Sequence, residues 1–145
     1  MYSVFEHYLM GEYVYTQTMI PVCDKHGLTY TELTVLLFLA NNPTLDTASD
    51  IVKCRNMAKS HVSVSVRSLE ERGMVEKEYR NGNRRSVHLR LTELASRIVQ
   101  DGREAQERFG DILFQGVPES EKNTVIAVLQ KMDRNIETYA KGGGK

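Results

Sequence analysis

The chain has 145 residues, of which 41% are hydrophobic and 26% charged, and its 19 basic and 19 acidic residues give a formal net charge of zero. This length fits one compact unit, or one domain with the elements needed to dimerise, and the composition is ordinary for a globular protein. No run approaches the roughly 18 apolar residues of a membrane span and no secretion signal is evident, so we expect a cytoplasmic protein without a membrane partner.

The first part of the chain predicts three helices. Apolar residues recur at helical spacing to about residue 26, with a kink or an end expected near Pro21 because proline disrupts the preceding turn. Residues 31–42 form a second, leucine-rich segment that ends at Asn41-Asn42-Pro43. A short third helix begins after Asp46 or Thr47, either of which can cap it, and runs to about residue 53.

The fourth predicted helix, about residues 58–72, is amphipathic. Val62, Val66 and Leu69 lie on one stripe, while small polar and basic residues occupy the other faces. Gly73 follows at a position where only a residue tolerant of positive φ fits at low cost. Such a helix can pack on a core with one side and enter a DNA major groove with the other.

A β-hairpin follows the fourth helix. Residues 74–80 and 86–91 alternate in polarity, and Asn81-Gly82 between them is a strong signal for a two-residue hairpin turn. Arg84 and Arg85 should therefore project beside the turn. The apolar face of the hairpin is expected to consist of Val75, Val87, Leu89 and Leu91.

Two long helices complete the chain. Thr92 and Glu93 open the first, which runs to about residue 114, and Gly102 and Gly110 should weaken it. Its expected apolar side comprises Leu94, Ile98, Ala105, Phe109 and Ile112 or Leu113. The last helix begins at Glu119 or Ser120 and repeats apolar residues in steps of four and three, a spacing that favours a partner helix. These residues are Val125, Leu129, Met132, Ile136 and Tyr139.

The fold class that these elements predict is mainly α with a small β-wing: a winged helix-turn-helix flanked by N- and C-terminal dimerisation helices. We expect an N-terminal dimerisation helix over residues 1–28 and a DNA-binding domain over 29–92. Residues 93–141 should complete the dimerisation domain, and residues 142–145 should form a flexible tail.

Charge is distributed unevenly along this neutral chain. Residues 53–90 contain ten basic and four acidic residues, so this segment carries +6 and the remainder −6. A basic module within an acidic body is typical of a protein that presents one face to phosphates. The candidate DNA contacts lie on the fourth helix and the wing; the alternative is that they form only a solvated polar face. They are Lys59, Ser60, His61, Ser63, Val64, Arg67, Arg84 and Arg85.

Other candidate sites have simpler interpretations. Aromatic residues crowd the first helix as core or dimer seam, or they line a pocket for a flat apolar effector; the pocket candidates are Tyr8, Tyr13, Tyr15, His26, Tyr30 and Phe38. Cys23 and Cys54 are inert thiols or redox sensors, and Cys23 with His26 makes only half of a zinc site, so we expect no metal and no cofactor. Phosphate-binding glycine loops and catalytic motifs are missing, so we expect no enzyme.

The order and several phrases of the chain resemble the MarR family of bacterial transcriptional regulators. The matching residues are Leu28-Thr29-x-x-Glu32 with Val35-Leu36, Ser68-Leu69-Glu70-Glu71-Arg72-Gly73-Met74-Val75, and Leu91-Thr92 after the wing. The resemblance implies a homodimer that binds a pseudo-palindromic operator in double-stranded DNA and represses a nearby operon until a small ligand or an oxidant releases it.

Two positions depart from the family pattern. The wing aspartate of an Asp-x-Arg motif is replaced by Asn83, which leaves Arg85 without an ion-pair partner and steered at most by a neutral hydrogen bond. Val64 stands where many members carry an arginine, and a valine reads a thymine methyl group or nothing. These departures keep an alternative open, in which the chain is a winged-helix interaction or scaffold module that has lost DNA binding.

Overall fold

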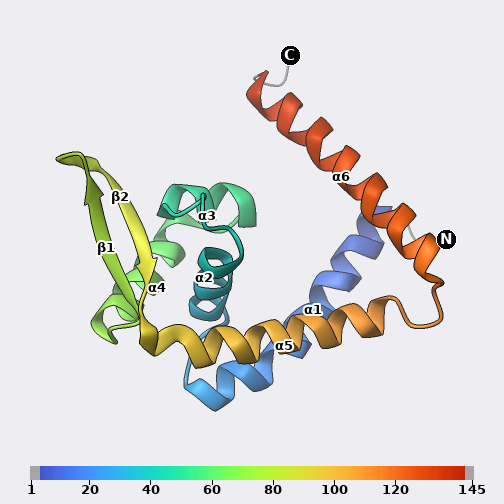
Figure 1. The fold of residues 1–145 in the computed structure, drawn as a ribbon, viewed down its shortest axis with the longest axis horizontal. Helices are drawn as coiled ribbons and strands as arrows, with labels where there is room; N and C mark the ends of the chain where they lie inside the picture. Colours follow the sequence, from blue (N-terminus) through green and yellow to red (C-terminus); the bar gives the residue numbers. More distant parts are fainter. Residues whose placement is uncertain (1–3, 143–145) are drawn as a thin grey trace. The chain divides into compact units, whose positions relative to one another are not determined.

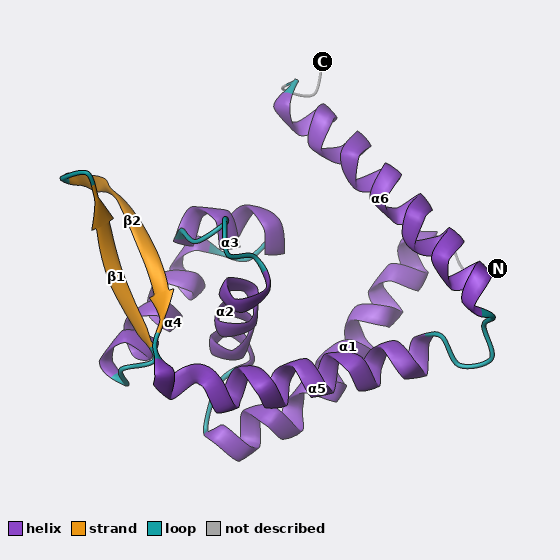
Figure 2. Cartoon of the chain, viewed as in Figure 1, coloured by secondary structure: helices purple, strands orange, loops and turns teal. Residues whose placement is uncertain are grey.

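The computed structural model describes residues 4–142, so Tyr2 and residues 143–145 of the expected tail lie outside the described residues. Helices dominate, and the two strands form one antiparallel hairpin (Figure 2). The predicted fold class, a mainly helical winged helix-turn-helix, is confirmed. The elements in chain order are α1 (Val4–His26), α2 (Tyr30–Asn41), α3 (Ala48–Arg55), α4 (Lys59–Glu71), β1 (Val75–Arg80), β2 (Asn83–Leu91), a 3-10 turn (Glu93–Ala95), α5 (Ser96–Leu113) and α6 (Glu119–Lys141).

The chain forms two compact units, one ending at Phe109 and one beginning at Gly110. The first contains α1 to α4, the wing and most of α5, and the second contains the end of α5 and all of α6 (Figure 1). The boundary between them falls inside the segment 93–141 that the sequence grouped together.

The core of the first unit is built around α2. Every residue from Glu32 to Leu39 is buried, which explains why this helix is apolar on all sides. Val62, Val66 and Leu69 of α4 are buried in the same core, as predicted from their spacing. The opposite side of α4 therefore faces solvent.

Local sequence signals set the ends of the helices. Thr29 and Thr47 each form a capping box with the residue three positions later, Glu32 and Asp50. Of the two predicted caps for α3, Thr47 therefore takes the role. Gly73 has φ +73°, as expected for the residue that ends α4.

Helix α1 reaches His26, as the sequence predicts, and Pro21 lies inside the helix rather than at its end. The structure corrects the expected apolar side of α5. Leu94 is 66% exposed because Glu93–Ala95 form a 3-10 turn, which takes Leu94 out of the apolar register of α5. Ile98 and Ala105 are buried as predicted, whereas Ile112 and Leu113 are exposed.

Gly102 has a packing role that the sequence did not suggest. It is buried in α5, and a Cβ atom on it would lie 2.7 Å from Cδ2 of Leu37 and 2.9 Å from Cδ1. The missing side chain lets α5 approach α2 closely at this point. Gly110, in the same helix, has open space for 4 Å around the position that a Cβ atom would occupy, and it therefore has no such role.

Candidate nucleic-acid interface

The exposed face of α4 carries all of its candidate DNA contacts. Lys59, Ser60, His61, Ser63, Val64 and Arg67 are exposed. Helix α4 also differs from α2 and α3 at its start, because its N-cap Ala58 makes no side-chain hydrogen bond to the first turn. The first N–H groups of α4 are therefore not used by a side-chain cap, and such groups are suited to a phosphate oxygen.

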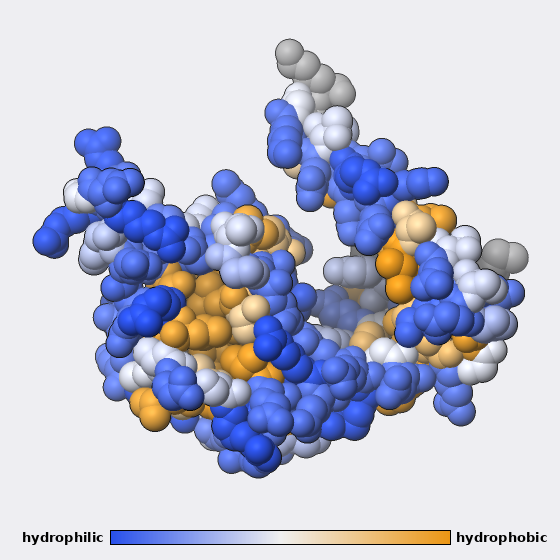
Figure 3. Space-filling model, viewed as in Figure 1, coloured by the Kyte–Doolittle hydropathy of each residue, from blue (hydrophilic) through white to orange (hydrophobic). Residues whose placement is uncertain are grey.

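The tip of the wing is a two-residue turn, as predicted. Asn81 and Gly82 both have positive φ, 54° and 68°, which is the geometry that matches the twist of a hairpin. The guanidinium of Arg84 lies 5.5 Å from the ring centroid of Tyr79. Oδ1 of Asn83 accepts a hydrogen bond of 2.9 Å from the backbone N–H of Arg85, so Asn83 orders the backbone of the tip. Hydrophilic side chains cover this tip (Figure 3).

Ion pairing sorts the ten basic residues of segment 53–90 into two groups. Four are paired: Arg72 with Glu32 at 4.0 Å, Lys77 with Glu70 at 3.1 Å, Arg80 with Asp46 at 2.9 Å, and Arg90 with Glu76. Among the described residues, the other six have no carboxylate in ion-pair contact; they are Lys53, Arg55, Lys59, Arg67, Arg84 and Arg85. The unneutralised cations of this segment therefore lie at the end of α3, on α4 and at the wing tip.

Lys53 and Arg55 were not among the sequence candidates. Both are exposed near the C-terminal end of α3, and both contributed to the basic segment counted in the sequence. The excess of positive charge in segment 53–90 was therefore the signal that could have identified these two residues, because helix spacing alone does not distinguish them.

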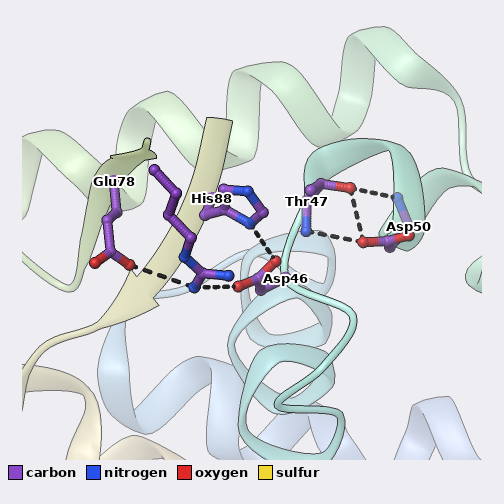
Figure 4. A network of polar contacts seen from close by, with 6 residues as sticks. Asp46, Thr47, Asp50, Glu78 and His88 are labelled. Atoms are coloured by element: carbon purple, nitrogen blue, oxygen red, sulfur yellow. Dashed lines mark hydrogen bonds and ion pairs between the residues drawn. The ribbon is translucent and has the colours of Figure 1, made fainter. Parts of the chain in front are cut away.

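Asp46 joins the wing to the segment before α3 (Figure 4). Its Oδ1 lies 2.7 Å from Nδ1 of His88, and its Oδ2 accepts a 2.9 Å hydrogen bond from Arg80. Thr47 and His88 form an isolated antiparallel bridge, so this segment lies alongside β2. Burial disfavours the charged form of Asp46, but His88 and Arg80 outweigh it and lower the pKa of Asp46.

Glu32 connects α2 to α4 by a side-chain hydrogen bond. It accepts hydrogen bonds from the backbone N–H of Thr29, at 2.9 Å, and from Oγ of Ser68 in α4, at 2.7 Å. Burial opposes ionisation of Glu32, yet these hydrogen bonds and the charge of Arg72 lower its pKa. Arg72 in turn donates to the carbonyl groups of Gly27 and His26, at 3.0 and 3.1 Å. Helix α4 is thus tied to the C-terminal end of α1 and the N-terminal end of α2.

A cluster around Asp101 ties α1 to α5. Asp101 Oδ2 lies 2.7 Å from both Nζ of Lys25 and Nε2 of His26, and Arg97 lies 3.3 Å from Oδ1. The hydrogen bonds from Lys25 and His26 lower the pKa of Asp101 to about 2. His26, a pocket candidate in the sequence, is therefore engaged in this ion-pair cluster.

The aromatic pocket candidates are dispersed. Tyr15 and Phe38 line one small cavity of about 70 Å³, where the hydroxyl of Tyr15 accepts a 2.9 Å hydrogen bond from Gln106. Tyr8 and Tyr13 are 68% and 62% exposed on α1, and neither they nor His26 and Tyr30 line this cavity. A larger, open groove of about 460 Å³ runs along α5, with Ala40, Leu91 and Val99 in its lining.

The two cysteines lie in different environments. Cys23 is buried in the core, and burial raises the pKa of its thiol, whereas Cys54 is exposed in α3. A thiol reacts as the thiolate, so the environment of Cys23 disfavours redox sensing. Within residues 4–142, no three histidine, cysteine or carboxylate side chains come close enough to hold a metal ion. No helix in the same range is long and apolar enough to cross a membrane.

Comparison with known proteins finds a family likeness over part of the chain. Residues 26–86 match the model of the MarR family. The uncharacterized HTH-type transcriptional regulator YdgJ of Bacillus subtilis is 29% identical over 105 residues, which are 72% of this chain and 62% of that regulator. The matched stretch thus spans less than two thirds of this relative.

Solved structures share the fold over most of the chain. A MarR-family transcriptional regulator from Silicibacter pomeroyi superimposes with a TM-score of 0.76 at 22% identity, covering 89% of this chain and 88% of that one. Bordetella bronchiseptica BpsR, whose DNA binding is regulated by 6-hydroxynicotinic acid, gives a TM-score of 0.68 at 20% identity and covers 90% and 99% of the two chains. Residues 26–86 are therefore similar in sequence to the MarR family, and the chain shares the winged helix-turn-helix fold of these solved structures.

Proposed function

We propose that this winged-helix chain is a member of the MarR family and a sequence-specific DNA-binding transcriptional regulator. In this proposal it acts as a dimeric repressor that binds a pseudo-palindromic operator and is released by a small ligand or an oxidant. Helix α4 enters the major groove, and the wing tip approaches the adjacent minor groove or backbone.

One observation carries the DNA-binding proposal: within segment 53–90, the cations without a carboxylate in ion-pair contact lie at the end of α3, on α4 and at the wing tip, and α4 and the tip are the surface that a winged helix presents to DNA. Acidic residues neutralise Lys77 and Arg90 on the strands, whereas Lys59 and Arg67 on α4 and Arg85 at the tip have no carboxylate in ion-pair contact within the described range. Counterion release by such cations supplies most of the non-specific affinity for a duplex.

The last helix supports the dimer. Considered by itself, α6 contains no buried residue among those described. Its seam residues Val125, Leu129, Met132, Ile136 and Tyr139 are 42% to 65% exposed. An apolar stripe with this spacing is suited to packing against another helix, so we assign it to the homodimer interface.

Three observations support release of the protein from DNA by an effector. BpsR, which shares the fold, responds to a small aromatic acid, and this chain has an open groove along α5 that is partly apolar. For an oxidant, Cys54 is the exposed candidate and Cys23 the buried one. Fluorescence titration with aromatic acids, with and without peroxide treatment, would separate the two kinds of effector.

The test of DNA binding compares two arginines. Arg85→Gln and Arg90→Gln each remove one positive charge, but only Arg90 is paired with a carboxylate, on Glu76. We expect Arg85→Gln to lower the slope of log K against log salt by about 0.9, the value for one phosphate contact, and Arg90→Gln to change it much less. Equal effects of the two variants would mean that charge alone, and not its placement, determines binding.

The rival function is a protein-interaction module. Val64 favours it, because this valine is 69% exposed in the middle of the recognition surface, where a large apolar side chain suits a protein partner. A duplex titration decides between the two functions, since binding to backbone phosphates must weaken steeply with salt. Absence of any salt-dependent duplex binding by the unmodified protein would favour the interaction module.

A further inference from the structure

We propose that Asp46 is a positioning residue for DNA binding: it holds the outer part of the wing against the rest of the winged helix, so that the tip meets DNA in a fixed place. This inference rests on the proposed function. It assigns a role to an acidic side chain that makes no DNA contact itself.

Asp46 contacts both strands of the wing at once. One carboxylate oxygen faces Nδ1 of His88 on β2 at 2.7 Å, and the other accepts a hydrogen bond from Arg80 at the end of β1, at 2.9 Å. Its backbone carbonyl also accepts a 2.8 Å hydrogen bond from the N–H of Leu89. The side chain of Asp46 is only 14% exposed, whereas Arg80 is 52% exposed. Figure 4 shows the arrangement.

The outer wing needs such a support because its own pairing is weak. The regular register of the hairpin is interrupted between Glu78 and Arg80, and beyond this bulge the strands are paired only by Arg80 with Asn83. A bulge bends a strand and increases its twist. Arg85 lies three residues beyond His88, which is about 10 Å along a strand. A rotation of the wing by about 20° would therefore move the tip by about 3–4 Å, more than a hydrogen bond tolerates.

The direction in which DNA affinity changes when the charge of Asp46 is removed distinguishes a positioning role from a purely electrostatic one. Asp46 is a negative charge close to a surface that binds phosphates, so removing this charge should strengthen DNA binding if electrostatics alone mattered. If Asp46 positions the wing, removing its charge should weaken binding, because the tip loses its fixed place. The two explanations therefore predict opposite results for one variant.

Asp46→Asn keeps the shape of the side chain and the backbone bond to Leu89 but removes the charge that holds Arg80 and His88. Its matched control is Glu78→Gln, which removes the other carboxylate near Arg80, at 3.4 Å, from within the wing itself. We expect Asp46→Asn to bind a cognate duplex at least about tenfold more weakly, with a lower salt slope, and Glu78→Gln to show no loss.

The same comparison is made in a variant whose wing tip lacks both arginines, Arg84→Ala with Arg85→Ala. There Asp46→Asn should cause no further loss, because the wing has no contact left to misplace. A loss of equal size in this background would show that Asp46 acts through the general stability of the fold and would overturn the proposal. Unchanged or tighter binding by Asp46→Asn in the full protein would also overturn it.

A measurement without DNA separates this inference from the proposed function. Trypsin cleaves after arginine, so cleavage at Arg84 and Arg85 reports how well the tip is held. We expect faster cleavage there in Asp46→Asn than in Glu78→Gln, measured at a temperature well below the melting transition of both variants. If Asp46→Asn is cleaved faster but the unmodified protein binds no duplex, the role of Asp46 in the wing stands and DNA binding is rejected. Equal cleavage of the two variants would reject the role of Asp46.

Discussion

Replacing Gly102 by alanine tests the close packing of α5 on α2. Two effects oppose each other. Alanine is a better helix former than glycine by about 1 kcal/mol, which would stabilise α5. The new methyl group, however, would lie 2.7 and 2.9 Å from the two Cδ atoms of Leu37, a side chain that is only 3% exposed. Overpacking of this kind costs about 1–3 kcal/mol, so we expect a net loss of up to about 2 kcal/mol in the free energy of unfolding.

Gly110→Ala is the matched control because it lies in the same helix with open space around it. This variant should gain about 1 kcal/mol from helix propensity alone. The difference between the two variants, measured by urea denaturation followed by helical circular dichroism, then isolates the steric cost of about 1–3 kcal/mol. Leu37→Val should relieve part of this cost in a double variant. If Gly102→Ala proved as stabilising as Gly110→Ala, the proposed close contact with Leu37 would be refuted.

Three further predictions concern acid stability, assembly and operator geometry. The pKa of Asp101 is lowered from 3.8 to about 2, so its contribution to stability is complete above about pH 3.8 and is lost as the pH falls toward 2. Asp101→Asn should therefore reduce the loss of stability between these two pH values, which is measured as the urea-unfolding midpoint at each pH. Leu129→Asp should convert the dimer into a monomer in sedimentation, whereas Lys131→Ala, outside the seam, should leave it dimeric, and a monomeric unmodified protein would contradict the assigned interface. Insertion of about five base pairs between the operator half-sites should abolish specific binding in a gel-shift assay, because it rotates one half-site to the opposite face of the duplex; unaltered affinity would argue against a dimer that reads two successive major grooves.

Features that depend on neighbouring residues were predictable from the sequence. The turn at Asn81-Gly82 requires positive φ at both positions, and few other residue pairs accept this geometry. Gly73 ends α4 for a related reason. The buried stripe of α4 follows from helical periodicity, and this periodicity in turn fixed which residues face solvent.

Features that depend on distant residues were not predictable. Asp46 and His88 are 42 positions apart, and nothing in their local sequence indicates that they meet. The sequence offered Asp46 only as a possible helix cap, a role that Thr47 takes. Gly102 looked like a defect of α5 because its partner, Leu37, lies on another helix.

The aromatic pocket shows the same limit. Clustering in the sequence grouped Tyr8 and Tyr13 with Tyr15, but on α1 the first two are exposed, and only Tyr15 joins Phe38 at a cavity. Which side of a helix is covered depends on the elements that pack there. A count of aromatic residues along the chain carries no information on that.

Because the two thiols have different surroundings, one of them can be labelled selectively in the folded protein. Because Cys23 is buried with a raised pKa and Cys54 is exposed, a maleimide dye applied to the folded protein should attach to Cys54. The chain has no tryptophan, so such a dye would supply the extrinsic fluorescence needed to follow changes near the end of α3. Since Cys54 stands between the unpaired cations Lys53 and Arg55, the dye would report directly on what approaches that part of the surface, without any engineered cysteine.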